Sequence, residues 1–360
     1  MALLTAFLNV AVGSARAFPR PAPGTENIPG MMASATLVCK GEVESAPTPT
    51  RVPSAVGVPR MTATAYVRPD RCFKGDSRGE LIPVSFDAFE TGVDPFFILR
   101  KGDYFLFFLK PHGTSSYEVV DRWFGALPVS RELGPVPKGA DSMDALEVDL
   151  KTGLRDPNPE RVLDSIRMLG NMRHLQSTAP LKELLESPDL LVRSYVWQAL
   201  LRLKEYAVLP VVVEFFDSQP AAPRELLLPR DRLFGMQWEL AIEIEQVREP
   251  SSLPSLETLA VHGKTFFLRM EPLQALRAIR SPHSAGVFLK ELDDTNPDNG
   301  FSAMQGLISL AGGGPIDWVP TWERFKEAPQ FYAAKCREWW ETEGRRKVDY
   351  RTTNSSTQRF

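Results

Sequence analysis

Ser187-Pro-Asp-Leu-Leu-Val-Arg-Ser-Tyr-Val-Trp-Gln-Ala-Leu-Leu-Arg-Leu-Lys-Glu-Tyr-Ala-Val-Leu-Pro210 is the stretch whose pattern decides the fold of this chain. Its apolar residues return every three or four positions, which is the spacing of one face of an α-helix. Asp189 precedes them and is a residue type that caps helix starts, and Pro210 opens a second helix. A single helical hairpin leaves apolar faces uncovered, so the stretch predicts a neighbouring hairpin on each side. The apolar positions of the first helix are Val192, Val196, Ala199, Leu200 and Leu203.

The same helical period continues on both sides of this stretch. Apolar residues keep it from Glu160 to Glu343, and the hairpins repeat at roughly 30 to 40 residues, the period of helical solenoids. We therefore predict an α-helical solenoid over residues 159–344, followed by a polar, disordered tail over 345–360. The predicted hairpins cover residues 160–186, 192–216, 232–261, 266–292 and 301–325, and a final helix covers 331–343.

The residues before the helical half have the alternation of β-strands. Ala35–Val43 and Thr62–Val67 are rich in β-branched and alternating residues. Tyr104–Leu109 is a nearly continuous apolar run, which suits a strand covered on both faces. About five strands with turns between them fit a small closed barrel, because closure leaves no long open edge. The remaining short strands are predicted over 81–86, 117–120 and 123–128.

Length, composition and charge limit the organisation and the partners. The 360 residues favour two domains, and 43% hydrophobic residues allow each half to bury a core. Residues 18–32 and 131–158 contain clusters of Pro and Gly and are predicted to be linkers, the second with room for one helical turn. The net charge of -3 argues against a nucleic-acid partner, which needs a basic face. No segment after the leader is apolar enough for an integral membrane helix.

Residues 1–17 have the features of an export signal. The run from Ala2 to Val12 is mostly apolar and too short to span a bilayer, and Ala15-Arg-Ala17 offers a cleavage point. No Lys or Arg precedes the run, and an upstream start codon would account for that missing charge. We expect a mature protein that begins near Phe18 and is secreted or periplasmic. The alternative is a disordered or weakly helical leader.

The stretch 187–210 resembles a HEAT repeat. That family has an acidic residue near the first helix start, a Val-Arg pair inside it and a proline that opens the second helix, as at Asp189, Val192-Arg193 and Pro210. The resemblance implies that Asp189 caps the helix and that Arg193 reaches acidic or carbonyl groups of a neighbouring repeat. It also implies a protein partner. The other hairpins keep mainly the apolar spacing of the family.

The β half resembles the netrin-like, TIMP-type OB barrel. The resemblance rests on Leu37-Val-Cys-Lys-Gly-Glu-Val43, on Val67 through Gly75 and on Leu99 through Phe108. It implies an OB-like barrel over residues 33–130. TIMP-type inhibitors bind a protease zinc through an N-terminal cysteine. The predicted mature start at Phe18 has no cysteine, so protease inhibition is not carried over.

The three cysteines allow two interpretations. Cys39 and Cys72 lie in the same β region, and an exported protein can oxidise such a pair. Alternatively, these two residues and Cys336 are small, buried apolar side chains. Their spacing does not have the form of a metal site.

The sequence lacks the motifs of common active sites. It has no His-Glu-x-x-His helix, no Gly-x-Ser-x-Gly elbow and no phosphate-binding glycine loop. Glu239 and Glu243 share a helix face and resemble a carboxylate pair, but a solvated acidic face is the favoured interpretation. Asp293 to Asp298 departs from the spacing of a Ca²⁺ loop, which favours an Asn-Pro turn with helix capping. We therefore predict no catalytic residue, no cofactor and no metal.

Tryptophans are concentrated near the end of the chain. Trp318, Trp322, Trp339 and Trp340 are expected chiefly to pack in the helical core. If exposed, they are interface anchors, so Trp322, Trp339 and Trp340 are candidate interface residues.

These observations favour a non-enzymatic interaction or scaffold protein that is exported and binds a protein partner. One alternative is a secreted inhibitor or sensor that acts through barrel loops near residues 46–60. Another is a cryptic hydrolase. Partner identity, pathway and oligomeric state do not follow from the sequence.

Overall fold

The computed structural model describes residues 26–52, 60–77, 79–89, 99–218, 232–315 and 317–348. The chain divides into two compact units, Met1–Met172 and Arg173–Phe360. Across these described ranges, none of the helices combines the length and the apolarity needed to cross a membrane.

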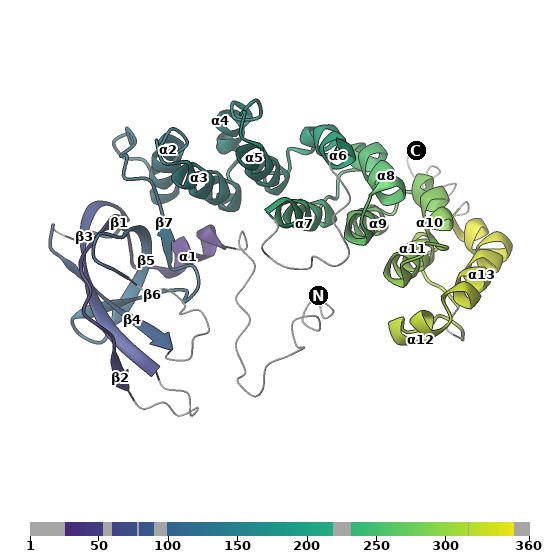
Figure 1. Cartoon of the computed structure of the whole chain (residues 1–360), viewed down its shortest axis with the longest axis horizontal. Coiled ribbons are helices and arrows are strands. Elements are labelled where there is room, and N and C mark those ends of the chain that lie inside the picture. Colours follow the sequence, from purple (N-terminus) through teal and green to yellow (C-terminus); the bar gives the residue numbers. More distant parts are fainter. Residues whose placement is uncertain are drawn as a thin grey trace, which may run out of the picture. The chain divides into compact units, whose positions relative to one another are not determined.

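The first unit contains a closed β-barrel (Figure 1). Its strands are β1 (Leu37–Ser45), β2 (Thr50–Val52), β3 (Arg60–Lys74), β4 (Ile82–Phe89), β5 (Tyr104–His112), β6 (Ser116–Val119) and β7 (Ala126–Pro128). The circuit runs β1–β3–β4–β6–β5 and back to β1, with antiparallel pairs except for the parallel pair of β4 and β6. A closed circuit of five strands is the architecture of an OB-type barrel, so the predicted β fold is confirmed.

Apolar side chains from the strands of this circuit fill the barrel. Strand β5 is covered on both faces, as its continuous apolar run predicts: Leu106, Phe107, Phe108 and Leu109 are all fully buried. Phe107 and Leu109 belong to the interior cluster. Strand β1 is also buried over its first five residues, whereas β4 alternates because only one of its faces looks inward. The interior cluster consists of Leu37, Cys39, Val43, Ala65, Val67, Ile82, Val84, Phe86, Leu99, Phe107, Leu109 and Ala126.

A short helix occupies the end of the first predicted linker. Helix α1 (Ile28–Ser34) contacts β5 and buries Ile28, Met31 and Met32. A proline in its first turn is compatible with a helix start, since that position needs no backbone N–H donor. The Pro- and Gly-rich composition of residues 18–32 therefore predicts a linker wrongly over residues 28–32.

The second predicted linker, residues 131–158, contains helix α2 (Ser142–Gly153). The side chain of Asp141 caps this helix by accepting hydrogen bonds from two backbone N–H groups of its first turn. Helix α2 contacts β3 and α3 (Pro159–Met172), and α3 contacts α1. Helix α3, which the sequence assigns to the solenoid, thus belongs to the barrel unit. The periodicity of α3 identified the helix but not the element it packs against.

A buried cluster of charges joins the barrel to α2. Lys40 of β1 is 2% exposed and forms an ion pair with Asp149 of α2. Arg71 of β3 reaches the same carboxylate at 2.7 Å, and the Gly134 backbone N–H donates to it at 3.0 Å. Burial lowers the pKa of Lys40 below its ordinary value, whereas Asp149 opposes that shift. The carboxylate thereby connects two strands and a helix at one point.

A second buried ion pair connects the chain before α1 to α3. Glu26 is 5% exposed, and its carboxylate lies 3.0 Å from Nε of Arg167. The Asn171 side-chain amide donates to the same carboxylate at 2.6 Å. Both partners belong to α3, so this contact joins residues that are far apart in the sequence.

The second unit is a stack of helical hairpins (Figure 1). The first helices are α5 (Leu190–Arg202), α7 (Arg232–Glu245), α9 (Phe266–Ile279) and α11 (Pro297–Leu310). The second helices are α6 (Leu209–Ser218), α8 (Leu253–His262) and α10 (Ala285–Glu291), which follow α5, α7 and α9 in the chain. Helix α4 (Thr178–Lys182) is the second helix that follows α3. Contacts between successive first helices, and from α6 through α8 to α10, form two rows, which confirms the predicted solenoid.

Each second helix begins after a short 3-10 turn. These turns are η1 (Leu175–Ser177), η2 (Tyr206–Val208), η3 (Pro250–Ser252) and η4 (Pro282–Ser284). The same local structure therefore recurs along one edge of the stack.

The end of the stack contains α12 (Trp322–Glu327), α13 (Pro329–Trp339) and the π-helical turn η5 (Trp340–Gly344). The helix continues through residue 348, so the start of the predicted disordered tail is helical. The rest of that tail, the predicted export signal and residues 53–59 lie outside the described residues.

Candidate interaction site

The stretch 187–210 forms a hairpin whose first helix is held at its start by two side chains. Asp189 caps α5, accepting from the Leu191 backbone N–H at 2.8 Å, as predicted. Arg193 donates from Nη1 to the Ser187 carbonyl, in the turn that precedes its own helix. The guanidinium thus reaches a carbonyl group, but of the turn before its own helix and not of a neighbouring repeat as the HEAT resemblance implies.

The same contact recurs two hairpins later. Thr265 caps α9, and Arg269, four residues further on, donates from Nη1 to the Gly263 carbonyl at 2.7 Å. Arg269 also binds Asp294 with two hydrogen bonds of 2.7 and 3.1 Å. Asp294 precedes α11, so this arginine connects successive hairpins. Burial raises the pKa of Asp294, but the hydrogen bonds from Arg269, Asn296 and Asn299 outweigh it and lower the pKa below its usual range.

The predicted Asn-Pro turn is confirmed at the start of α11. Asn296 caps the helix by accepting from the Asp298 backbone N–H at 2.8 Å. Asp294 accepts from the Asn296 backbone N–H at 2.7 Å and from the Asn299 side chain at 2.9 Å. These carboxylate and amide oxygens accept hydrogen bonds that stabilise the turn and its contact with Arg269 of the adjacent hairpin.

The carboxylates Glu239 and Glu243 join neighbouring helices. Glu239 of α7 accepts from the Gln198 side chain of α5 at 3.2 Å. Glu243 pairs with Arg202 of α5 at 2.7 Å, and both side chains are largely buried. The favoured prediction of a solvated acidic face is therefore wrong, because helix α5 covers this face of α7.

These pairs also establish that the first helices run parallel. From α5 to α7, residue 198 meets 239 and residue 202 meets 243, so both numbers rise together. From α7 to α9, the rings of Trp238 and Phe267 lie 5.4 Å apart. Glu245 lies close enough to Glu271 to raise its pKa. The ends of α5, α7 and α9 consequently lie along one edge of the second unit.

That edge carries a recurring basic residue that the sequence analysis missed. Lys204, Arg248 and Arg280 stand there, two positions before η2, η3 and η4, and Arg173 has the same position before η1. All four residues are exposed. We call these four residues the basic edge. The only signal in the sequence is a basic residue just after each of the helices α3, α5, α7 and α9, which helix capping alone also explains.

Two of the three candidate interface tryptophans are inside the helical unit. Trp339 is 5% exposed and Trp340 is 3% exposed, and their rings lie 6.4 Å apart. They fill the end of the stack and leave little surface for a partner. Trp322 is half-buried, and its ring stacks on Phe301 with centroids 6.2 Å apart. The expected core packing is thus confirmed for Trp339 and Trp340, and their alternative assignment as interface residues is wrong because packing occupies their faces.

Cys39 and Cys72 lie opposite each other on β1 and β3 and are joined by a disulfide. Cys336 is a buried free thiol in α13, and burial raises its pKa to about 12. A thiol with such a pKa stays protonated at neutral pH and is a poor nucleophile.

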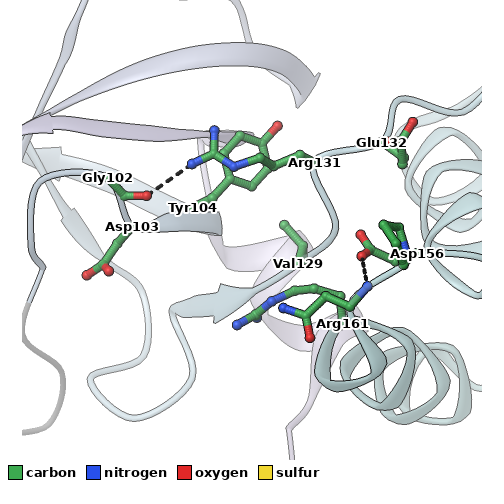
Figure 2. A pocket seen from close by; sticks show the side chains of 10 residues that line it. Gly102, Asp103, Tyr104, Val129, Arg131, Glu132, Asp156 and Arg161 are labelled. Carbon is green, nitrogen blue, oxygen red and sulfur yellow. Dashed lines mark hydrogen bonds between the residues drawn. The ribbon is translucent and has the colours of Figure 1, made fainter.

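The first unit has a polar recess of about 410 Å³ between the barrel and its helices (Figure 2). Arg131 lies over the Tyr104 ring, 4.7 Å from its centroid, and donates to the Gly102 carbonyl at 3.0 Å. Asp156 and Arg161 line the opposite side. Burial, followed by a hydrogen bond to Asp70, raises the pKa of Tyr104 above its usual value, so its hydroxyl stays protonated. The recess offers donors and acceptors without a nucleophile activated by a neighbouring base.

Comparison with known proteins agrees with the helical half. The family of HEAT repeats matches residues 148–228, a range that begins within α2 and includes α3 to α6. No curated protein matches the chain. HEAT repeats are interaction modules, and the match includes the hairpin that begins at Asp189.

Proposed function

We propose that this chain is a non-enzymatic, exported interaction protein whose HEAT-type hairpins hold a protein partner. The observation that carries the proposal is the uninterrupted contact of α5, α7, α9 and α11, within a chain that matches the HEAT repeats. A stack of this kind presents an extended surface built from rigid elements, which suits protein binding.

The contacts of the acidic residues support a non-catalytic role. Acid–base chemistry needs a carboxyl group that can reach a substrate in a cleft. Glu239 and Glu243, the carboxylates that most resemble a catalytic pair, hold Gln198 and Arg202 of the adjacent helix. A hydrolase screen with the purified protein tests this part: turnover that disappears in Glu243→Gln would contradict it.

Export is supported by the apolar leader and by the disulfide of the barrel. Disulfides persist in oxidising compartments and are rare in the cytosol. Mass spectrometry of the native protein tests both features. We expect an N-terminus near Phe18 and a mass that increases by about two hydrogen atoms on reduction. A native protein that retains Met1 and has free thiols at Cys39 and Cys72 would remove the assignment.

Cross-linking in the native host, followed by identification of the captured neighbours, tests the interaction itself. Exposed apolar residues offer matched variants: Leu175→Glu and Val211→Glu on the helical unit, and Tyr66→Glu and Leu81→Glu on the barrel. These side chains are 70%, 47%, 43% and 43% exposed, so each variant is expected to fold. We expect the helical pair to reduce capture of a specific neighbour and the barrel pair to leave it unchanged.

An inhibitor or sensor that acts through the barrel is the second candidate. The recess beside Tyr104 and Arg131 favours it, since a small polar ligand would find both donors and acceptors there. Loss of the captured neighbour only in the barrel variants would select this candidate over the helical surface.

A further inference from the structure

The basic edge combines a repeated charge with an unusual backbone. Arg173, Lys204 and Arg280 have φ angles of 56°, 63° and 58°, and they are the only described non-glycine residues with positive φ. Lys204 and Arg280 follow the first helices α5 and α9, Arg173 follows α3, and each of the three precedes a 3-10 turn. The left-handed conformation is unfavourable for residues with a Cβ atom, and helices that end in this way usually have glycine there.

The chain itself uses glycine at the end of α11, where Gly312 has a φ of 73°. A glycine is therefore compatible with this type of helix end in the same protein. A basic side chain also interacts favourably with the carbonyl end of a helix, and Arg248 donates to the Glu245 and Val247 carbonyls. Arg173, Lys204 and Arg280 have no ion-pair partner among the described residues.

We propose that the basic edge binds acidic side chains spaced along an extended segment of the protein partner. This inference rests on the proposed interaction function and names the chemistry of the partner. Glu205 and Glu249 directly follow Lys204 and Arg248 on the edge. These carboxylates would repel a broad anionic surface such as a membrane or a nucleic acid, whereas separate acidic side chains can meet the cations individually.

The spacing of the edge defines the period of the acidic residues. Helices packed side by side lie about 8–10 Å apart, so the edge residues just after α5, α7 and α9 follow at about that interval. An extended chain advances about 3.3 Å per residue, and three residues therefore cover about 10 Å. Acidic residues at every third position of a partner segment match successive hairpins.

Two labelled peptides of identical composition test the proposal with the full chain at low salt. One carries glutamate at every third position among serines, and the other carries its glutamates in one block. We expect the periodic peptide to bind more tightly, with an affinity that falls as salt is added, because these are exposed ion pairs. Equal binding of the two peptides, or no binding of either, would overturn the proposal.

Matched variants distinguish binding at the basic edge from a general attraction of the peptide to positive charge on the helical unit. Arg173→Gly, Lys204→Gly and Arg280→Gly combined should weaken binding about tenfold, which is the scale of three exposed ion pairs. The thermal midpoint should stay equal or rise, because glycine relieves the left-handed backbone. The control combines Arg324→Gln, Lys335→Gln and Arg345→Gln, which are exposed on the same unit, and it should bind like the wild type.

Three results would overturn the inference. The first is an equal loss in both triple variants, and the second is a lower thermal midpoint with unchanged binding, which would assign the edge to helix capping. The third is tighter binding to vesicles with anionic lipids than to the periodic peptide. Cross-linking of the edge variant in the native host distinguishes the two proposals. If the variant still captures the specific neighbour, the interaction function is supported and the role of the basic edge is rejected.

Discussion

The barrel unit and the helical unit use polar contacts in opposite ways. In the barrel unit, Asp149 receives Lys40, Arg71 and the Gly134 backbone at one buried point. In the helical unit, Arg193 and Arg269 make the same carbonyl contact in different hairpins. A unique buried network makes distant parts of a unit depend on one residue, whereas a repeated contact limits each dependence to neighbours.

The largest effect is expected from Asp149→Ala. The change leaves Lys40 buried without its carboxylate, and breaking a buried ion pair from one side costs about 3–5 kcal/mol. Denaturant unfolding, followed by a probe of the barrel, measures the loss. The double variant Lys40→Met with Asp149→Leu should recover most of it, since no charge is left unpaired. A loss as small as that of the exposed control Lys138→Ala would contradict the assignment.

Val196→Asp tests the helical side of the comparison. Val196 is fully buried in α5, so the new carboxylate is unpaired and should cost the helical unit about 3 kcal/mol. Hydrogen exchange should show the loss in α5 and the adjacent hairpins, with the barrel still protected. Val211→Asp, at a position that is 47% exposed, is the matched control. Unchanged thermal unfolding of Val196→Asp would refute the register of the repeat.

Arg269→Ala should cost about 2 kcal/mol, because hydrogen bonds to a charged group are lost. Arg193→Ala should cost less, since Arg193 has a carbonyl rather than a carboxylate as its partner.

The pKa of Asp294 is lowered in the folded protein, so the stability that its carboxylate contributes is present above the unfolded pKa. Unfolding curves should therefore converge for wild type and Arg269→Ala as the pH falls through the folded pKa of Asp294.

Glu271→Gln tests how a buried carboxyl group sets the pH dependence of the helical unit. Burial, and then the nearby Glu245, raise the pKa of Glu271 from about 4.5 to about 8. The folded state thus holds a proton that the unfolded state releases, and wild-type stability falls as the pH rises from about 4.5 to about 8. Glu271→Gln should flatten this fall and be the more stable protein at pH 8. Glu291, whose pKa burial raises to about 7, contributes with the same sign.

A parallel fall in stability for wild type and Glu271→Gln would show that Glu271 is already ionised at neutral pH. Thermal unfolding at several pH values makes the measurement, and Glu257→Gln on α8 serves as a less buried control.

Sequence reasoning succeeded where a feature is local. The cap at Asp189, the Asn-Pro turn at Asn296 and the apolar strand at residues 104–109 depend on residues a few positions apart. It failed for Glu239 and Glu243, whose partners lie 41 residues earlier in the chain. The favoured expectation that Trp339 and Trp340 pack in the helical core is confirmed, whereas side-chain type alone could not exclude their alternative role as interface residues.

Periodicity and residue type were enough to establish a closed β structure followed by stacked helical hairpins, because backbone propensity and amphipathic spacing are properties of short segments. They could not show that a lysine at position 40 is buried, or that α3 packs with the barrel rather than with the helices that follow it. They could not show either that Arg173, Lys204 and Arg280 have a left-handed backbone. Those features arise only when distant segments meet, since burial and pairing are decided by neighbours in space.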